Sequence, residues 1–172
     1  GLDRYDGGKA LLEDLAGGSP RRSWAMLPGD WPGEVATAAA ATASAGRGVV
    51  IVVPDARDVA RVDHALTGAL GAGQHVALTA DLGPAERYRR FLAVSRGAVR
   101  VVVGTRAAVW APAHELGLIV IWDDGDDLLA EPRAPYSHAR DVAVLRAHRA
   151  GAGLLLAGHA VTAEAAQLVA AG

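Results

Sequence analysis

Short apolar runs alternate along the chain with longer stretches of helical periodicity, and Gly, Pro or Asp stands at each junction. The apolar runs are nearly continuous in Val, Ile and Leu instead of alternating with polar residues. Such runs are typical of parallel strands that are covered on both faces. We therefore predict strands at residues 24–27, 49–53, 75–78, 99–103, 118–121 and 154–157.

The stretches between these runs carry apolar residues at helical spacing and predict helices. Their ranges are 34–45, 57–70, 84–95, 137–148 and 162–170, with a further helix near 8–15. Regular alternation of strands with helices favours right-handed crossovers and a doubly wound sheet. The predicted fold class is α/β with a mostly parallel central sheet, and ligands are expected at the carboxyl ends of its strands.

Composition and charge restrict what the chain can do. Its 172 residues are 51% hydrophobic, which is enough for one domain with its own core. The net charge of −2 gives no overall attraction for a polyanion, so any nucleic-acid contact has to come from a local patch. Because there is no cysteine, disulfides and thiolate metal sites are excluded, and a cytoplasmic location is expected. We expect no membrane contact, since no apolar run is long enough to cross a bilayer and no signal-peptide pattern is present.

The loop after the first predicted strand, LPGDWPGE (27–34), stands where a nucleotide hydrolase of this fold class binds phosphate. Such a loop needs glycines whose backbone N–H groups surround the phosphates, a lysine that neutralises them and a hydroxyl that holds Mg²⁺. Here two prolines remove N–H groups, lysine and hydroxyl are both missing, and the two charged residues are acidic. We expect no triphosphate binding in the usual mode.

The stretch LGLIVIWDDGDDLL (116–129) has the pattern of a buried strand followed by a cluster of acids. In P-loop enzymes the first Asp after this strand positions Mg²⁺ and a following Glu polarises the attacking water. Trp122 occupies the first of these positions and cannot bind a hard cation. A shift of one residue, to Asp123, would turn the side chain to the other face of the strand. We interpret the acids as a solvated loop, with an adventitious Mg²⁺ or Ca²⁺ site as the alternative.

Two segments, RVVVGTRAAVWAPAHELGLIVIWDDGDD (100–127) and YSHARDVAVLRAH (136–148), resemble the first helicase lobe of the PriA family of superfamily 2 replication-restart helicases. The segment VVIVVPDARD (49–58) also stands where that family has a Val-Pro-Glu segment. The matching residues, in order and at nearly the family's spacing, are Gly104-Thr105-Arg106, Ala111-Pro112, Leu116-Gly117, Asp126 and His138-Ala139-Arg140-Asp141. The resemblance covers the chain from about Trp24 and, more weakly, from Gly1. It implies a RecA-like (P-loop NTPase-type) three-layer fold and one helicase lobe, residues 1–172, of a longer multidomain protein.

The departures from the family fall on its ATPase motifs. Pro32 and Gly33 replace the Walker A Lys and Thr, and the segment Trp122–Gly125 replaces Asp-Glu-Glu-His. The family's Gly-Ser-Ala-Thr-Pro motif becomes GHAVT (158–162). The resemblance is therefore to a degenerate, helicase-dead actinobacterial type with no catalytic residue. Its vestigial nucleotide-binding positions are Gly29, Pro32, Gly33, Trp122 and Asp123.

The resemblance also implies DNA contact at Gly104, Thr105 and Arg106, because this motif touches the nucleic-acid backbone in superfamily 2 lobes. A glycine permits close approach, while the Thr hydroxyl and the guanidinium bind phosphate. A tight turn with an arginine salt bridge is the equal alternative. We add Arg140 as a candidate DNA contact, although its segment also fits the start of a helix capped by Ser137. A basic run provides either further phosphate contacts or a solvated helix face: Arg87, Arg89, Arg90, Arg96 and Arg100.

No cofactor is expected in this chain. The family binds zinc through a cysteine-rich insertion, and this cysteine-free chain does not contain it. The six histidines show no metal-ligand spacing, and ATP and Mg²⁺ are not expected to bind.

Trp31 and Trp122 lie at or beside the altered nucleotide motifs, which suggests that apolar side chains fill the volume a nucleotide once occupied. We expect a lobe that contacts forked or single-stranded DNA and other primosome or replication proteins at stalled forks, without ATPase or helicase activity. Two alternatives stay open. One is an active ATP-dependent 3′-5′ DNA helicase lobe with an unorthodox nucleotide site, and the other is a stand-alone α/β protein that binds a metal or a small acid.

Overall fold

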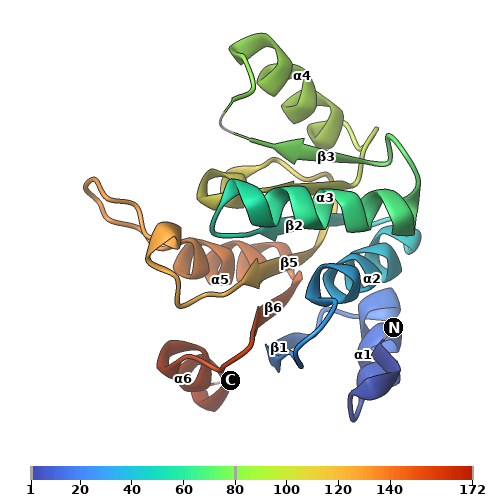
Figure 1. The fold of residues 1–172 in the computed structure, drawn as a ribbon, viewed down its shortest axis with the longest axis vertical. Coiled ribbons are helices and arrows are strands. Elements are labelled where there is room, and N and C mark those ends of the chain that lie inside the picture. Colours follow the sequence, from blue (N-terminus) through green and yellow to red (C-terminus); the bar gives the residue numbers. More distant parts are fainter. Residues whose placement is uncertain (1, 80, 172) are drawn as a thin grey trace.

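A parallel sheet of six strands runs through the part of the chain that the computed structural model describes, residues 2–79 and 81–171. Its strand order is β1-β6-β5-β2-β4-β3, with β1 and β3 at the two edges (Figure 1). Every pairing between neighbouring strands is parallel. The α/β fold with a parallel central sheet is thereby confirmed. The strands are β1 (Arg21–Ala25), β2 (Gly48–Val52), β3 (His75–Leu78), β4 (Val101–Gly104), β5 (Leu116–Trp122) and β6 (Gly153–Gly158).

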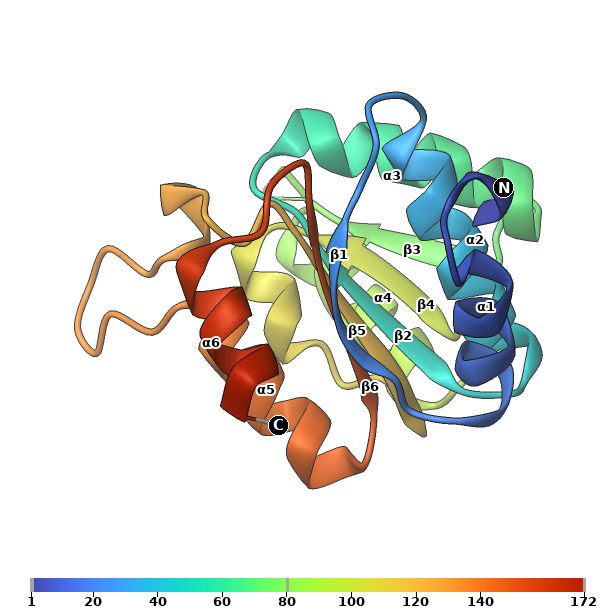
Figure 2. The same ribbon diagram turned by 90° about the horizontal axis from the view of Figure 1, so that it is seen from below.

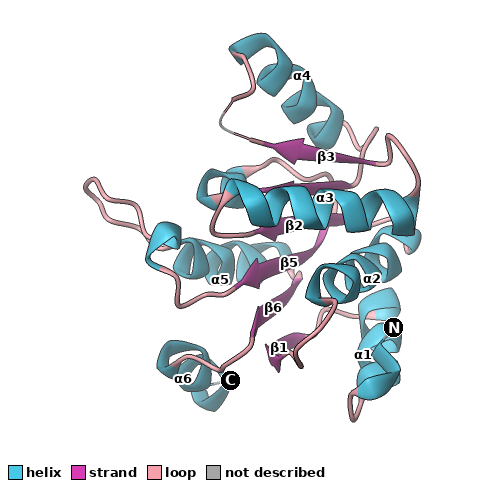
Figure 3. Ribbon diagram, viewed as in Figure 1, coloured by secondary structure: helices cyan, strands magenta, loops and turns pink. Residues whose placement is uncertain are grey.

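Helices cover both faces of this sheet and produce three layers (Figures 2 and 3). The helices α1, α2 and α3 share one buried cluster with the sheet, and α4, α5 and α6 contribute to the cluster on the other face. The α-helices are α1 (Gly8–Gly17), α2 (Trp31–Ser44), α3 (Ala56–Leu70), α4 (Pro84–Ser95), α5 (Ala139–Ala150) and α6 (Ala163–Ala171). Short 3₁₀-helices occur at Leu2–Arg4, Arg106–Trp110 and Asp127–Leu129.

The apolar runs are strands because each central strand is buried on both sides. In β2, Val49 and Ile51 face the cluster of α1 to α3, while Val50 and Val52 face the cluster of α5. The same alternation of side chains runs through β4 and β5, so a continuous apolar run fills two cores at once. This two-sided burial explains why the strands appear in the sequence as nearly continuous apolar runs.

Several predicted boundaries were wrong by two or three residues: α2 begins at Trp31 instead of residue 34, and β4 begins at Val101 instead of residue 99. The first strand was expected at residues 24–27, but β1 is Arg21–Ala25, and Trp24 is its buried residue. Because β1 is an edge strand whose other residues are polar or exposed, it has no apolar run that could mark it. Ser137 was expected to cap the helix before Arg140, but the N-cap of α5 is His138, whose Nδ1 accepts the backbone N–H of Arg140 at 3.1 Å. Burial lowers the pKa of His138, which keeps this nitrogen free to accept.

The strand order brings three loops together at one edge of the sheet. Since β1, β6 and β5 are adjacent and parallel, the segments that follow them leave the sheet side by side. The N–H of Met26 donates to Gly158 O at 2.8 Å, and the N–H of Asp123 donates to Ala157 O at 2.7 Å. Among the described residues, no helix combines the length and the apolar character that a bilayer crossing would require.

Gly104 at the end of β4 provides a test of this packing. A Cβ added there would lie 2.8 Å from Ala108 Cβ and 2.8 Å from Leu78 O, so Gly104→Ala is expected to lower the free energy of unfolding by about 1–3 kcal/mol. A Cβ at Gly68 in α3 would meet nothing within 4 Å, so Gly68→Ala is expected to raise the free energy of unfolding by about 0.5–1 kcal/mol. Urea unfolding of both variants measures the difference, and a shift of the same sign in the two would contradict the tight contact.

Candidate functional site

The loop between β1 and α2 stands at the expected phosphate position, and a carboxylate already occupies the start of its helix. Asp30 is the N-cap of α2, and its side chain accepts the backbone N–H of Gly33 at 3.1 Å. Pro32 lies in the first turn and has no N–H to offer. Of the vestigial positions, Gly29, Pro32 and Gly33 therefore surround an acidic cap, which opposes phosphate binding at this helix N-terminus.

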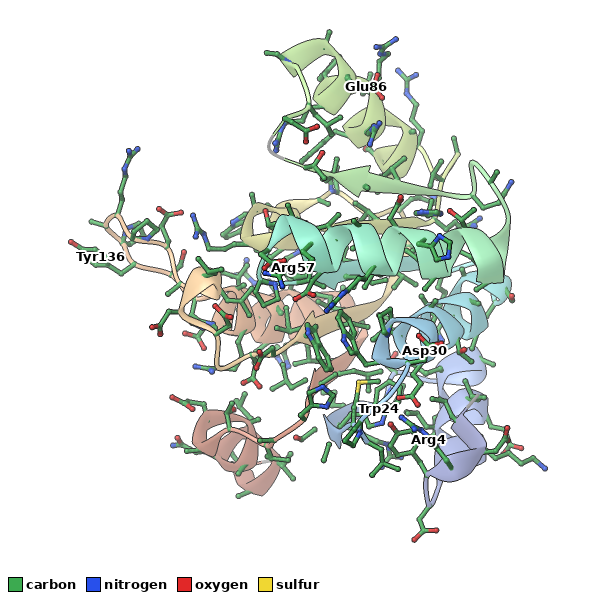
Figure 4. The ribbon with its side chains drawn as sticks, in the orientation of Figure 1. Arg4, Trp24, Asp30, Arg57, Glu86 and Tyr136 are labelled. Carbon is green, nitrogen blue, oxygen red and sulfur yellow. The ribbon has the colours of Figure 1, made fainter. Side chains whose placement is uncertain are left out.

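The side chain of Arg4 lies against the same loop and contacts its carbonyl oxygens. Its Nη2 donates to Leu27 O at 3.0 Å, and its Nη1 donates to Pro28 O at 3.1 Å. Its Nε donates to Glu34 Oε1 at 2.7 Å, and Glu34 itself is buried. Figure 4 shows Arg4 beside the segment that carries Asp30. No sequence signal indicated Arg4, because these partners lie far away along the chain.

Trp31 and Trp122 stack on each other in the volume between the loops. Their ring centroids are 3.9 Å apart and their planes differ by 4°. His159, from the loop after β6, meets Trp122 edge-on at 5.1 Å, and its Nδ1 lies 3.2 Å from Met26 O. Both tryptophans are buried, with exposed fractions of 6% and 5%. The two rings thus fill space between the loops, and a former nucleotide site at this position stays a hypothesis.

The acids after β5 take structural positions instead of forming a cluster of ligands. Asp124 is 3% exposed, and its Oδ2 accepts from Thr162 Oγ1 at 2.7 Å and from Arg140 Nη1 at 3.2 Å. Asp126 accepts the N–H of Leu128 at 2.8 Å and caps the 3₁₀-helix Asp127–Leu129. No group of three or more His, Asp or Glu side chains placed to hold a metal ion occurs in the described ranges.

Asp123 is exposed and lies in the left-handed region, with φ at 53°. Partial burial, together with the neighbouring carboxylates Asp126 and Asp124, raises the pKa of Asp123. Burial and the neighbouring carboxylates thus both disfavour the ionised form of Asp123 relative to an isolated aspartate.

The predicted DNA-binding residues make different contacts in the structure. Gly104 packs tightly against Leu78 and Ala108, and Thr105 precedes the 3₁₀-helix Arg106–Trp110. Arg106 donates to Leu128 O at 3.0 Å and Ala130 O at 3.1 Å, and it pairs with Glu131 Oε2 at 3.1 Å. The turn with an arginine salt bridge, one of the two alternatives, is therefore present. A DNA contact at Gly104, Thr105 and Arg106 stays a prediction.

Arg140 forms a buried ion pair with Asp124. The exposed fractions of the two side chains are 11% and 4%. The guanidinium also lies 3.5 Å from Asp141 Oδ1. A DNA contact from Arg140 stays a prediction, whereas its bond to Asp124 joins α5 to the end of β5.

Much of the basic run in and after α4 is used within the molecule. Arg87 donates to Thr79 O at 3.0 Å, and Arg90 donates to Ala77 O. Arg89 pairs with Glu86 at 2.6 Å, and Arg100 donates to Gly46 O. Arg96 is exposed. Three of the five arginines thus bind backbone carbonyls instead of presenting a continuous basic face.

A projecting loop between Ala130 and His138 carries exposed residues that the sequence did not single out. Its base is closed by the N–H of Glu131, which donates to Ser137 O at 2.9 Å, and by a bridge between Ala130 and His138. Tyr136 is 69% exposed and lies on the part of this loop that projects away from the sheet (Figure 4). Arg133 is also exposed, and its carbonyl oxygen accepts a hydrogen bond from the N–H of Tyr136 at 2.8 Å. The loop thus presents a cation and an aromatic ring, and its base is bonded to Arg106 through Glu131.

Comparison with known proteins relates the whole chain to replication restart proteins. It is 51% identical, over an alignment of 174 residues, to "Probable replication restart protein PriA" of Mycobacterium tuberculosis. That alignment covers all of this chain and 27% of the relative. The Mycobacterium leprae protein of the same description is 47% identical, and that alignment also covers all of this chain and 27% of the relative. The chain therefore spans about a quarter of the length of these relatives, and no family model matches it.

Among solved structures, the crystal structure of the DUF1998 helicase MrfA bound to DNA is similar to this fold. The TM-score is 0.53 at 12% sequence identity, and the match covers 79% of this chain and 19% of that chain. At this identity the likeness concerns the fold alone. The three-layer arrangement of this chain is thus similar to part of that helicase.

The tryptophan stack predicts that nucleotide does not enter this site. Addition of ATP with Mg²⁺ is expected to leave tryptophan emission unchanged up to millimolar concentrations, because Trp31 and Trp122 report directly on the volume between the loops. Trp110→Leu serves as a control, since Trp110 is 61% exposed and dominates any nonspecific quenching. A saturable emission change at micromolar nucleotide in the Trp110→Leu variant would show that the site is open.

The pair of Arg140 with Asp124 predicts a large loss of stability when one partner is removed. Arg140→Met leaves a carboxylate that is 3% exposed without its cation and is expected to cost about 3–5 kcal/mol of unfolding free energy. Arg149→Met, at an exposed position of the same helix, is expected to change it by less than about 0.5 kcal/mol. Chemical denaturation compares the two variants, and equal values for both would refute the structural role of Arg140.

Proposed function

Because the chain is PriA-like over its whole length, with a helicase-like fold, we propose that it acts in replication restart as a DNA-binding and scaffolding lobe without ATPase or helicase activity. The proposal concerns this lobe. The chain spans 27% of the length of its mycobacterial relatives, so what the rest of such a protein adds lies outside it.

The stack of Trp31 on Trp122 is the observation that carries the proposal of nucleotide independence. The two rings lie 3.9 Å apart at the meeting point of the loops after β1 and β5, which is the place where a nucleotide hydrolase of this fold holds phosphate and Mg²⁺. Aromatic pairs of this kind add about 0.5–1.5 kcal/mol to the burial of the two side chains. Nucleotide binding would have to separate a buried aromatic pair without the compensating contacts of a lysine.

The residues around this stack do not fit a triphosphate with its metal ion. The charges at the helix N-terminus are the carboxylates of Asp30 and Glu34, and the Arg4 guanidinium is already bonded to Glu34 at 2.7 Å. On the opposite side stands Trp122, with no oxygen ligand for Mg²⁺. These features support the loss of hydrolysis rather than its replacement by another mechanism at the same site.

The proposed DNA contact lies at the carboxyl edge of β4 and in the adjoining projecting loop. Arg106 at this edge is 32% exposed and is positioned by Glu131 at the base of the loop, while Arg133 and Tyr136 are exposed on the loop itself. An arginine and an exposed aromatic ring are the groups that bind phosphate and stack on unpaired bases. MrfA, whose structure is similar in fold, was crystallised bound to DNA, which supports a nucleic-acid partner for a lobe of this kind.

The overall charge makes this contact local and weakly dependent on salt. With a net charge of −2, the chain does not attract DNA through its whole surface. Each phosphate that a cation neutralises contributes a salt slope of about 0.7 for a single strand. A small footprint around Arg106 and Arg133 is therefore expected to give a shallow dependence on ionic strength.

Fluorescence anisotropy with single-stranded and forked oligonucleotides tests the proposal. Tyr136→Ala is expected to weaken single-strand binding about tenfold, because stacking on one base contributes about 1–3 kcal/mol. Arg133→Ala is expected to reduce the salt slope by about 0.7. Arg149→Ala, at an exposed position in the last turn of α5, is the matched control and should change neither value.

An ATPase assay in the presence of the same oligonucleotides completes the test. No DNA-stimulated hydrolysis above the buffer rate is expected. Identical binding by wild type, Tyr136→Ala and Arg149→Ala would remove the projecting loop from the interface. DNA-stimulated ATP hydrolysis that is abolished by a substitution in this lobe would overturn the proposal as a whole.

A further inference from the structure

We infer that the loop after β1, together with Glu34, is a guanidinium-binding site whose resident ligand is the side chain of Arg4. The site is built from the carbonyls of Leu27 and Pro28 and the carboxylate of Glu34. It does not depend on whether the lobe contacts DNA. The site binds a cation, whereas the loop at this position in a nucleotide hydrolase of this fold class binds an anion.

The geometry matches the planar, forked shape of a guanidinium. Three of its nitrogens each meet a different acceptor: Nε meets Glu34 Oε1 at 2.7 Å, Nη1 meets Pro28 O at 3.1 Å and Nη2 meets Leu27 O at 3.0 Å. An ammonium group is a compact point charge and cannot span acceptors placed along such a fork. The site is therefore specific for the shape of the cation as well as for its charge.

The polarity of the loop is reversed relative to a phosphate-binding loop. Backbone N–H groups converge on the ligand in a phosphate loop, whereas here carbonyl oxygens converge on it. The N–H of Leu27 donates instead to Tyr5 Oη at 2.9 Å, and the N–H of Gly33 donates to Asp30. Two of the amides that could hold an anion are thus already bonded to oxygens of the protein.

Gly29 allows the loop to approach the cation. Its φ of 138° is rarely adopted by residues with a side chain, and a Cβ there would lie 3.1 Å from Arg4 Nη1. The glycine that the sequence shares with a phosphate loop thus makes room for a guanidinium here.

The buried carboxylate of Glu34 makes the cation necessary. Glu34 is 4% exposed, its Oε1 receives Arg4 and its Oε2 receives the hydroxyl of Tyr5 at 2.6 Å. A buried carboxylate without its cation is strongly unfavourable. The segment from Leu2 to Tyr5 is therefore held on the lobe by its cation, with buried Leu2 on one side and the Tyr5 ring edge-on to Trp24 at 5.7 Å on the other.

Chemical rescue with methylguanidinium tests the site directly. Arg4→Ala is expected to be less stable than wild type, and methylguanidinium at millimolar concentration should raise its unfolding midpoint in a saturable way. At ten times its Kd, a ligand that binds only the folded state multiplies the folding equilibrium constant about elevenfold. Wild type should show no such gain, because its own Arg4 occupies the site.

Three controls separate this site from nonspecific effects. Methylammonium at equal ionic strength should not rescue Arg4→Ala, since it lacks the fork. The double variant Arg4→Ala with Glu34→Gln should not respond to methylguanidinium, since the carboxylate is gone. Pyrophosphate should not stabilise Arg4→Ala, since the loop presents oxygens to its ligand.

The inference fails if methylguanidinium acts equally on wild type and on both variants, or if pyrophosphate is the ion that rescues Arg4→Ala. Should Arg4→Ala not fold alone, the refolding yield with each ion replaces the unfolding midpoint and discriminates in the same way. Arg4→Lys gives a second measure. A stability equal to wild type would show that charge alone suffices and would overturn the requirement for a guanidinium.

Discussion

Parallel pairing of the strands is the constraint on which the rest of this molecule depends. Parallel neighbours have to be joined by crossovers, so every strand of the sheet ends at the same edge. The order β1-β6-β5 then sets three loops side by side, although their sequences are separated by most of the chain. This edge exists because the central strands bury Val, Ile and Leu on both faces, and it persists whatever residues the loops carry.

At this edge the side chains of the loops are bonded to one another or stacked together. Trp122 lies on Trp31, Asp30 caps α2, and Glu34 pairs with Arg4. The ring stack removes apolar surface from water, and the helix cap and the ion pair give polar groups a partner within the protein. The result is an internally bonded edge that the fold maintains without a lysine in the loop after β1 or an acid at position 122.

Much of the fold could be predicted from the order of residues, and the exceptions have physical causes. Helix α4 begins and ends as predicted at residues 84 and 95, because Pro84 begins it and its apolar spacing is regular. Strand β1 was misplaced because an edge strand buries little, and Trp24 alone marks it. The start of α5 was misassigned because His138 and Ser137 both precede the helix, and backbone geometry selects the histidine as its cap.

The sequence by itself determined the alternation of strands and helices, the missing lysine and the two tryptophans at the altered motifs, since each of these is a property of residue type and local spacing. It also placed Arg106 and Arg140 at the ends of strands or helices. Only the tertiary structure decided that Arg140 is buried against Asp124, that Trp31 stacks on Trp122, and that Arg4 lies in the loop after β1. Those contacts join residues far apart in the chain, and they depend on the order of strands in the sheet, which local patterns do not specify.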